Sequence, residues 1–402
     1  MHDNEFITFQ TFTRSTDSTR IVSNDLNSSF MYSQLIKEML IDAELEYDED
    51  FMNTFIEVCR AENQDNTSQL LNITSFERTY KNHSAMWWYT KEWFLYSTVN
   101  QALRTQDVTK LFLMGVFIRD LHLQLIELQQ TNPENQSFDT VYRGQGMIES
   151  ELQRLRENRA GLLSFNNFLS TSCDYDVSLM FARSARDNPE YLGILFRMNM
   201  NSKTDIQSPY ASLHGISFYP EENEILFSMH TIFRIVDVRE METRLWLIEL
   251  DFTNEQDREL AELLAQLRSE IYVPGVFNVD KVGQLCLKMG DFDGALEVYQ
   301  TLIRLFPDNQ IPLAYSHHHL GLAYQGKDDF DQAIVHYEKS LDIRRSLVSE
   351  NEIERFSLIV YANLSYIPIL SSILSLTLVV EIDQKLLLFH HDALRQNHSA
   401  VK

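Results

Sequence analysis

The sequence predicts an α+β domain followed by a small array of α-helical hairpins. Apolar residues recur with helical spacing up to residue 132, whereas short strand-like runs fill residues 138–252. Helical spacing then returns, and one sequence unit is repeated. Helices followed by a mostly antiparallel β region are typical of an α+β domain.

The domain boundaries follow from these changes of pattern. We expect a mobile tail at 1–29, a main domain at 30–254 with a helical part at 30–132 and a β core at 138–252, a repeat region at 255–347, and an apolar C-terminal segment at 348–402. The tail is rich in Ser, Thr, Asn and Asp, and we predict only an edge strand in it, at Phe6–Phe12.

The chain is strongly acidic. Of its 402 residues, 34 are Lys or Arg and 58 are Asp or Glu, so the formal net charge is −24. Such a charge repels phosphate groups, and we expect neither nucleic acid nor an anionic membrane surface as a partner. A basic or arginine-bearing protein fits the sign of the charge better. With 44% hydrophobic residues, the chain can bury a sizeable core.

Cysteine usage and the first residues bear on the compartment. Cys59, Cys173 and Cys286 are widely spaced and form neither a metal-ligand pattern nor a disulfide framework. The first twenty residues lack the basic-then-apolar plan of a signal peptide. The sequence therefore predicts a cytoplasmic protein without a metal site.

Several helices are predicted in the first part of the main domain. Apolar residues recur with a period near 3.6 over Phe30–Leu40 and Phe51–Cys59. A long apolar helical stretch then runs from about Ser84 to Leu128 and includes the tryptophan cluster Trp87–Trp93. A binding platform is one interpretation of this cluster, but we expect buried core.

Six strands and two short helices are predicted in the β core. The runs are short and rich in β-branched and aromatic residues, which favour strands. We predict strands at 139–144, 165–172, 193–200, 224–227, 231–238 and 244–251, and helices near 148–157 and 176–185.

A repeated unit follows a predicted connecting helix at 255–270. Gly290–Ala295 is echoed 38 residues further on by Asp328–Ala333. At the same offset Gly283 matches Gly321 and Tyr299 matches Tyr337. This spacing resembles the tetratricopeptide repeat, in which small residues let two helices pack closely. The resemblance implies a peptide or protein partner. An unrelated pair of helical hairpins is the alternative.

The segment from Phe356 to Val380 carries no charge and is long enough to span a bilayer. Asn363, Pro368 and several serines dilute its apolar character. We expect a decayed third repeat, or sequence foreign to the mature chain. A membrane anchor is the alternative.

Three short motifs in the β core carry the chemistry. They are Val141-Tyr142-Arg143-Gly144, Phe168-Leu169-Ser170-Thr171-Ser172, and Tyr219-Pro220-Glu221-Glu222-Asn223-Glu224. Each is common alone, but all three, in this order and at strand edges, form a specific pattern. The pattern resembles the arginine-type mono-ADP-ribosyltransferase family over roughly Ser84 to Phe252. The resemblance implies a helical part and two β-sheets around an NAD cleft.

The resemblance assigns chemistry to two carboxylates. Cleavage of the nicotinamide–ribose bond of NAD builds positive charge on the ribose, and a nearby carboxylate stabilises it. The resemblance gives this role to Glu224. Glu222 is expected to bind the acceptor guanidinium, because residues two apart on a strand point to the same face. A solvated acidic turn is the alternative for these residues.

The other site residues are also assigned by resemblance. Arg143 is expected to hold the NAD phosphate and ribose, and the backbone of Gly144 to approach the nicotinamide. Ser170 is expected to lie near Glu224, with support from Thr171 and Ser172. A role in capping the next helix is the alternative for Ser172. Phe218 could stack on nicotinamide or the target arginine, or pack in the core.

The sequence therefore predicts an NAD-dependent protein-arginine mono-ADP-ribosyltransferase. NAD would be a co-substrate, no metal would be needed, and a protein with an exposed arginine would be the acceptor. Two alternatives stay open. One is NAD glycohydrolysis, and the other is an inactive relative whose repeats bind peptides.

Overall fold

The computed structural model describes residues 9–12, 25–41, 49–91, 93–131, 138–200, 208–218, 223–253, 261–262, 265, 278–305, 307–308 and 310–347. The chain divides into two compact units, Met1–Glu270 and Ile271–Lys402. The first holds the α+β part and the second a helical array, as the sequence predicted for the fold class.

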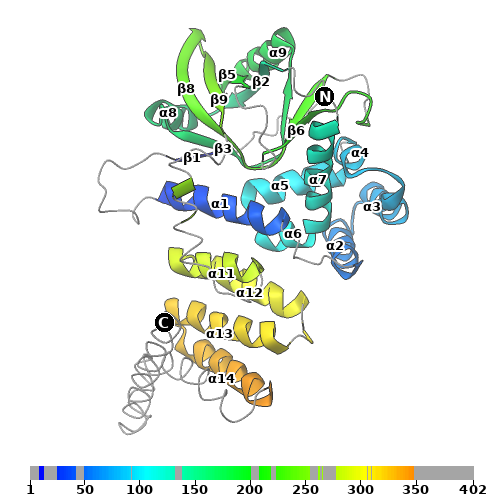
Figure 1. Ribbon diagram of the computed structural model, residues 1–402, viewed down its shortest axis with the longest axis vertical. Coiled ribbons are helices and arrows are strands. Elements are labelled where there is room, and N and C mark those ends of the chain that lie inside the picture. The colour runs from blue at the N-terminus through cyan, green and yellow to red at the C-terminus, as the bar shows by residue number, and fades with distance from the viewer. Residues whose placement is uncertain are drawn as a thin grey trace, which may run out of the picture. The chain divides into compact units, whose positions relative to one another are not determined.

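The first unit begins with one short strand and a group of helices (Figure 1). They are β1 (Phe9–Phe12), α1 (Asp25–Ile41), α2 (Glu49–Glu62), α3 (Thr67–Thr79), the 3-10 turn η1 (Tyr80–Asn82), α4 (Ala85–Tyr89), α5 (Phe94–Thr105), α6 (Val108–Leu113) and α7 (Gly115–Thr131). The predicted apolar stretch from Ser84 to Leu128 is thus four helices. Caps separate them, since Ser84 accepts a hydrogen bond from the Trp87 amide and Asp107 one from the Lys110 amide.

The edge strand predicted in the tail is present at residues 9–12, whereas the start of α1 within the tail was not predicted. Residues 9–12 form an edge strand paired with β3 (Leu162–Phe165), and helix α1 starts at Asp25. The side chains of Phe9 and Thr11 are buried, which anchors the strand. The rest of the tail lies outside the described residues.

The β region forms one mixed sheet. Its elements after β1 are β2 (Thr140–Met147), α8 (Glu149–Glu157), β3, β4 (Leu169–Ser172), α9 (Tyr175–Arg186), β5 (Leu192–Asn199), β6 (Tyr210–Ser212), β7 (Glu224–Phe227), β8 (Thr231–Glu242) and β9 (Leu245–Phe252). The strand order is β1-β3-β8-β9-β5-β2-β4-β7-β6. Strands β5 and β9 pair in parallel, and the other pairs are antiparallel. The predicted strand at 165–172 is two strands, and β6 was missed.

The expectation of two separate sheets is wrong for the described strands. Hydrogen bonds link all of them into one sheet, but the link between β2 and β4 is narrow. Strand β2 pairs with β5 along its whole length, whereas it pairs with β4 only where Tyr142 faces Ser172. Among the described residues, this pair is the only strand pairing between the two halves of the sheet.

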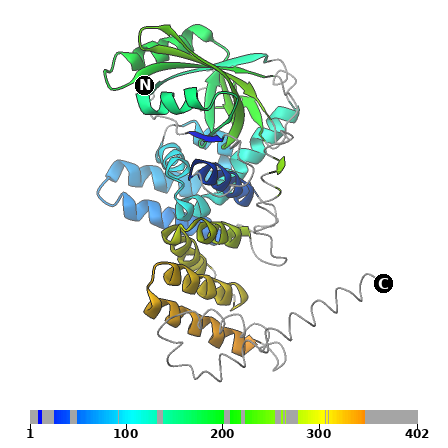
Figure 2. The ribbon, with the colours of Figure 1, turned by 90° about the vertical axis from the view of Figure 1, so that its left-hand side faces the viewer.

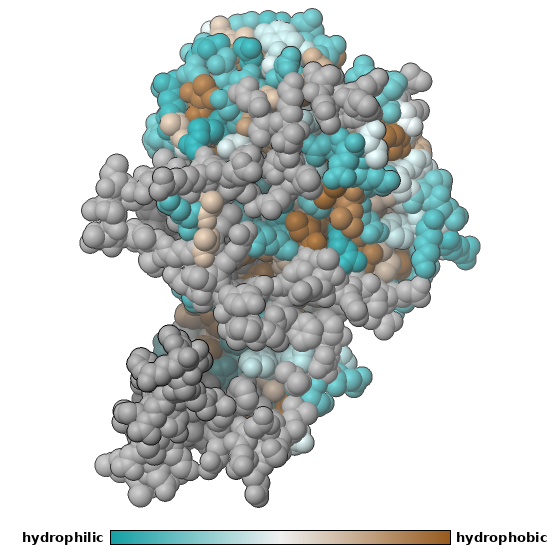
Figure 3. Space-filling model, viewed as in Figure 1, coloured by the Kyte–Doolittle hydropathy of each residue, from teal (hydrophilic) through white to brown (hydrophobic). Residues whose placement is uncertain are grey.

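A smaller hydrophobic cluster packs α9 on one face of this sheet, and the main core cluster of the β region lies on the other face. Aromatic rings fill the main cluster, with Phe165 packed edge-on against Phe196 and Phe233. Polar contacts also attach the helices α1 and α7 to the β region. Gln34 of α1 donates to the Ser164 hydroxyl, and His122 of α7 lies 2.7 Å from the Ser228 hydroxyl. Burial lowers the pKa of His122 to about 3, so this ring is neutral at physiological pH. On the face seen in Figure 3, hydrophobic residues form separate patches between hydrophilic ones.

The second unit is a stack of paired helices (Figure 2). Helices α11 (Asn278–Met289), α12 (Phe292–Leu305), α13 (Gln310–Gly326) and α14 (Phe330–Leu347) pack each against the next. The repeated glycines explain the close packing. A Cβ on Gly283 would lie 2.4 Å from the Tyr299 ring, and one on Gly321 would lie 2.5 Å from the Tyr337 ring.

Two predicted segments are largely or wholly undescribed. Of the connecting helix at 255–270 only residues 261–262 and 265 are described, and they are helical. Residues 356–380 lie outside the described part of the chain. Among the described helices, none combines the length and apolar character that crossing a membrane requires.

The three thiols differ in their reactivity. Cys59 and Cys286 are buried, whereas Cys173 is exposed. Burial raises the pKa of Cys59 to about 12, which leaves almost no thiolate near neutral pH. We therefore expect iodoacetamide at pH 8 to modify Cys173 alone in the native protein and all three cysteines after denaturation. Peptide mass spectrometry measures both, and native labelling of Cys59 would contradict the described packing.

Candidate active site

Arg143 lies near the middle of β2, where this strand meets β4. Its Nη1 donates to the backbone oxygen of Ser170 at 2.7 Å, and its Nε donates to Oε1 of Gln145 at 3.1 Å. The first bond crosses the narrow join between the two halves of the sheet. The second holds the guanidinium from within its own strand. Both bonds fix the plane of the guanidinium, and its Nη2 has no hydrogen-bond partner among the described residues.

Ser170, Thr171 and Ser172 form most of β4. Their exposure alternates along the strand, with both serines half-buried and Thr171 buried. The Thr171 hydroxyl donates to the backbone oxygen of Ile225 at 2.9 Å and so ties β4 to β7. The Ser172 hydroxyl accepts from the amide of Asp174, the N-cap of α9. This bond agrees with the capping role that was one interpretation of Ser172.

Glu224 is the first residue of β7. The strand register sets it directly opposite Ser172, while Ser170 faces Leu226. Side chains directly opposite in an antiparallel pair share a face, so Ser170, Ser172 and Glu224 share one face, with Ser172 closest to the carboxylate. The sequence interpretation expected Ser170 to lie near Glu224, and the register places it two residues along β4 from Ser172, the residue that faces Glu224.

Electrostatics couple Arg143 to the helical part and to Glu224. Burial lowers the pKa of Arg143, while Tyr96, Glu224 and Tyr89 act in the opposite direction. Arg143 is half-buried, so part of the residue remains exposed to water. Arginine stays charged under these conditions, because its intrinsic pKa exceeds about 12. A fixed positive charge therefore lies close to the Glu224 carboxylate.

Gly144 has a packing reason to be glycine, besides its expected approach to nicotinamide. A Cβ at this position would lie 1.8 Å from the backbone oxygen of Ser178 and 2.7 Å from the amide nitrogen of Ala182. The missing side chain thus makes room for α9, and not for an approaching ligand on that face. Gly193 on β5 meets α9 in the same way, since its Cβ would lie 2.3 Å from the Ala182 oxygen. The two glycines let the helix lie close to the sheet.

The remaining predicted residues precede β7 in the chain. Phe218 is half-buried, and its amide donates to the Thr90 hydroxyl at 2.9 Å. Its ring packs against Trp87 with the centroids 5.3 Å apart. Phe218 therefore contacts the helical part near the end of α4. Glu222 and Tyr219 lie outside the described residues.

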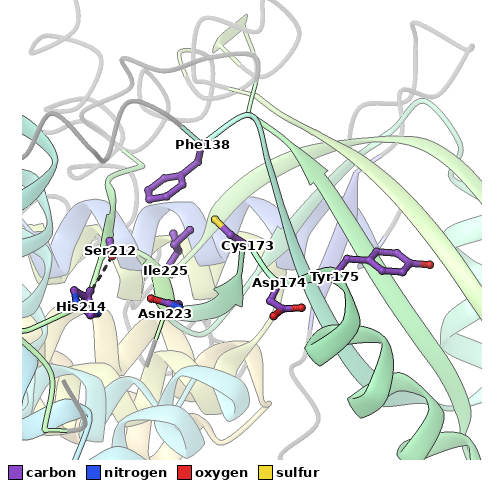
Figure 4. A pocket seen from close by; sticks show the side chains of 8 residues that line it. All are labelled: Phe138, Cys173, Asp174, Tyr175, Ser212, His214, Asn223 and Ile225. Atoms are coloured by element: carbon purple, nitrogen blue, oxygen red, sulfur yellow. Dashed lines mark hydrogen bonds between the residues drawn. The ribbon is translucent and has the colours of Figure 1, made fainter. Parts of the chain in front are cut away.

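An open cavity of about 750 Å³ lies beside the start of β7 (Figure 4). It is lined by Phe138, Cys173, Asp174, Tyr175, Ser212, His214, Asn223 and Ile225. The alternation of side chains along a strand directs Glu224 to the face opposite Ile225. The cavity thus borders the Arg143–Glu224 site without containing it.

Three site neighbours escaped the sequence interpretation. Gln145 was detectable in principle, since it lies two residues after Arg143 and shares its strand face. Tyr89 and Tyr96 come from α4 and α5, and nothing local in the sequence links them to β2. The Tyr89 hydroxyl donates to Asn100, which also accepts from the Asn167 amide just before β4. This network holds the helical part against the strand that carries Ser170.

The arrangement suits an anionic ligand with a cleavable sugar bond. Arg143 supplies a fixed cation, Ser170 and Ser172 supply hydroxyls, and Glu224 supplies an acceptor, all on the adjacent strands β2, β4 and β7. Within the described residues, no cluster of His, Cys, Asp and Glu side chains has the composition to hold a metal ion.

Comparisons with known proteins identify the two regions. A tetratricopeptide repeat model matches residues 276–346, and an NAD:arginine ADP-ribosyltransferase model matches residues 22–258. No curated protein matches the sequence of this chain.

Solved structures similar to the chain include bacterial ADP-ribosyltransferases. The Vis toxin from Vibrio splendidus is 20% identical, with coverage of 55% of this chain and 92% of that one and a TM-score of 0.33. HopU1 of Pseudomonas syringae pv. Tomato DC3000 is 19% identical, with coverage of 57% and 98% and a TM-score of 0.35. The catalytic domain of VahC from Aeromonas hydrophila is 19% identical, with coverage of 42% and 96% and a TM-score of 0.31.

The family match spans more than half of the chain, from before α1 to just after β9, and includes all three motifs. The chain belongs to the NAD:arginine ADP-ribosyltransferase family, whose co-substrate is NAD.

Proposed function

We propose that the first unit transfers ADP-ribose from NAD to the guanidinium of arginine in a target protein. One observation carries this proposal. Arg143, Ser170 and Glu224 lie on the adjacent strands β2, β4 and β7, with the Arg143 guanidinium bonded to the Ser170 backbone and electrostatically coupled to Glu224. These residues are separated by up to 81 positions in the chain.

The proposed reaction replaces one bond to the ribose by another. The bond between the ribose C1′ and the nicotinamide nitrogen breaks, and nicotinamide leaves with the bonding electrons as a neutral molecule. Positive charge develops on the ribose, and the Glu224 carboxylate stabilises it. A guanidine nitrogen then bonds to C1′ and loses a proton. Arg143 would hold the pyrophosphate through paired N–H donors, for which the guanidinium geometry is suited.

Loss of the acceptor's proton is the difficult step. Arginine is a weak nucleophile because its pKa exceeds about 12. Under the proposal Glu222 orients the guanidinium and accepts this proton, since it lies two residues before Glu224. Support for this role comes from sequence spacing and family membership.

Agmatine, a small guanidine, tests the acceptor directly. The full chain is mixed with NAD and agmatine, and the products are separated by mass. We expect ADP-ribosyl-agmatine and nicotinamide in equal amounts. ADP-ribose without the agmatine adduct would instead support NAD glycohydrolysis. No product, together with peptide binding by the second unit, would support an inactive relative.

Substitution of Glu222 separates transfer from hydrolysis. In Glu222→Ala we expect agmatine transfer to fall at least a hundredfold, in the range measured for loss of one catalytic proton-transfer group. Slow NAD hydrolysis should persist, since Glu224 is intact. Initial rates of both products measure the split, with Glu221→Ala as the matched control in the same segment. Normal arginine transfer by Glu222→Ala would overturn the assignment.

The second unit is proposed to bind a peptide or protein partner. Its two helical hairpins have the paired packing of a tetratricopeptide array, in which neighbouring hairpins bury a continuous core. A partner held there would raise the local concentration of an arginine acceptor near the enzyme. Pull-down of the same partner by the full chain and by the Glu224→Gln variant would support a binding role independent of catalysis.

A further inference from the structure

A lysine lies inside a group of four aromatic rings at the end of α4. The Nζ atom of Lys91 is 3.3 Å from the ring centre of Trp93, 4.5 Å from Trp87, 5.2 Å from Phe218 and 5.4 Å from Trp88. We call Trp87, Trp88, Trp93 and Phe218 the aromatic cage. An ammonium within about 6 Å of an aromatic ring centre is attracted to the face of that ring, and tryptophan gives the strongest attraction. Lys91 therefore binds several rings at once.

The cage joins two parts of the chain that are far apart in sequence. The three tryptophans and Lys91 belong to α4 and the turn after it, whereas Phe218 follows β6 by several residues. The Phe218 amide also donates to the Thr90 hydroxyl, and the ring of Trp87 stacks on His83 at 3.7 Å. Burial lowers the pKa of Lys91, which agrees with an ammonium partly removed from water.

The cage corrects the expectation that the tryptophan cluster is simply core. Trp88 is buried, but Trp87 and Trp93 are half-buried and accessible beside the lysine. A core role explains Trp88. It does not explain why a charged side chain is held among the other rings.

We propose that Lys91 is a positioning residue that fixes Phe218 and thereby selects guanidinium acceptors over water. The proposal rests on the proposed function. Phe218 lies six residues before Glu224. Strand β7 is held by β4, and Phe218 is held by the cage and by Thr90, so both ends of the connection between them are anchored. The acceptor side of the site is then preorganised, which matters more for a bound guanidinium than for a water molecule.

Two variants of the full chain separate the charge from the shape of the side chain. Lys91→Met keeps an unbranched apolar stem and removes the cation, whereas Lys91→Arg keeps a cation that stacks on aromatic rings. We expect the ratio of agmatine transfer to NAD hydrolysis to fall about tenfold in Lys91→Met, with a higher KM for agmatine. In Lys91→Arg the ratio should stay within about twofold of the unchanged chain.

Hydrogen exchange provides a readout that does not depend on activity. The peptide that contains Phe218 should exchange faster in Lys91→Met than in the unchanged chain, and Lys91→Arg should restore slow exchange. Similar melting temperatures for both variants would exclude a general loss of stability.

Each outcome bears on the proposal. Unchanged exchange and an unchanged product ratio in Lys91→Met would overturn it. Faster exchange with an unchanged ratio would show that the cage holds Phe218 without selecting the acceptor, which also overturns it. If the unchanged chain converts NAD to no product, the proposed function fails. Slow exchange at Phe218 that depends on the Lys91 cation would then still support the structural link.

Discussion

Glu224→Gln is expected to lower both agmatine transfer and NAD hydrolysis by at least a thousandfold. The amide keeps the size and hydrogen-bonding capacity of the side chain but removes the negative charge that stabilises the ribose cation. Removal of one well-placed stabilising group from an active site typically costs about a hundred- to thousandfold in kcat, and a full charge opposite a developing charge lies at the upper end. Nicotinamide release measures both reactions together.

A matched control removes an equivalent charge elsewhere. Glu190→Gln changes an exposed glutamate in the turn before β5, and we expect rates within about twofold of the unchanged chain. The binding of NAD to Glu224→Gln should stay within a few-fold of normal, because Arg143 and the serines are intact. Equal losses in both variants would point to net charge, and not to the site, as the cause.

Gly144→Ala is expected to destabilise the first unit by about 3 kcal/mol or more. The new methyl group would lie 1.8 Å from the Ser178 oxygen and 2.7 Å from the Ala182 nitrogen, and both are backbone atoms of α9 that cannot rotate away. For a domain of this size we expect the melting temperature of the first unit to fall by roughly 6–12 °C. Thermal unfolding followed by circular dichroism checks this.

Substitutions of two further glycines serve as comparisons. Gly193→Ala should destabilise by a similar amount, because its Cβ would lie 2.3 Å from the Ala182 oxygen. Gly215→Asn should have little effect, since no heavy atom lies within 4 Å of a Cβ there and asparagine tolerates its positive φ of 75°. A stable Gly144→Ala variant would mean that α9 lies farther from the sheet than described.

The fold class was predictable because the period of the apolar residues changes twice along the chain. The pairing of strands was less predictable, since strand order depends on contacts between distant segments. Strand β6 has only three residues, too few for a periodic signal. The break between β3 and β4 falls at Asn166 and Asn167, which are buried polar residues within an apolar run. Local sequence gave no reason to expect a single sheet.

The candidate site was predictable only in its motifs. Alternation along β2 puts Gln145 on the same strand face as Arg143, but Gln145 lies outside the motif, and the other surroundings of the guanidinium come from distant parts of the chain. Tyr89 and Tyr96 belong to α4 and α5, whose apolar spacing resembles ordinary core, and the aromatic cage combines the end of α4 with the distant Phe218. Gly144 was predicted to allow a close approach of nicotinamide, and the close approach that the structure shows is that of α9. Packing between segments that are distant in the sequence determines the neighbours of Arg143 and Gly144. Such packing cannot be recognised in a single sequence.

The most direct test of the central claim is the mass of the product formed from NAD and agmatine by the full chain, compared with the Glu224→Gln variant. We predict a single ADP-ribosyl-agmatine adduct that appears with an equal amount of nicotinamide and is absent in Glu224→Gln. Formation of the same adduct at an undiminished rate by Glu224→Gln would contradict the account, because the reaction would then not depend on the carboxylate that faces Ser172.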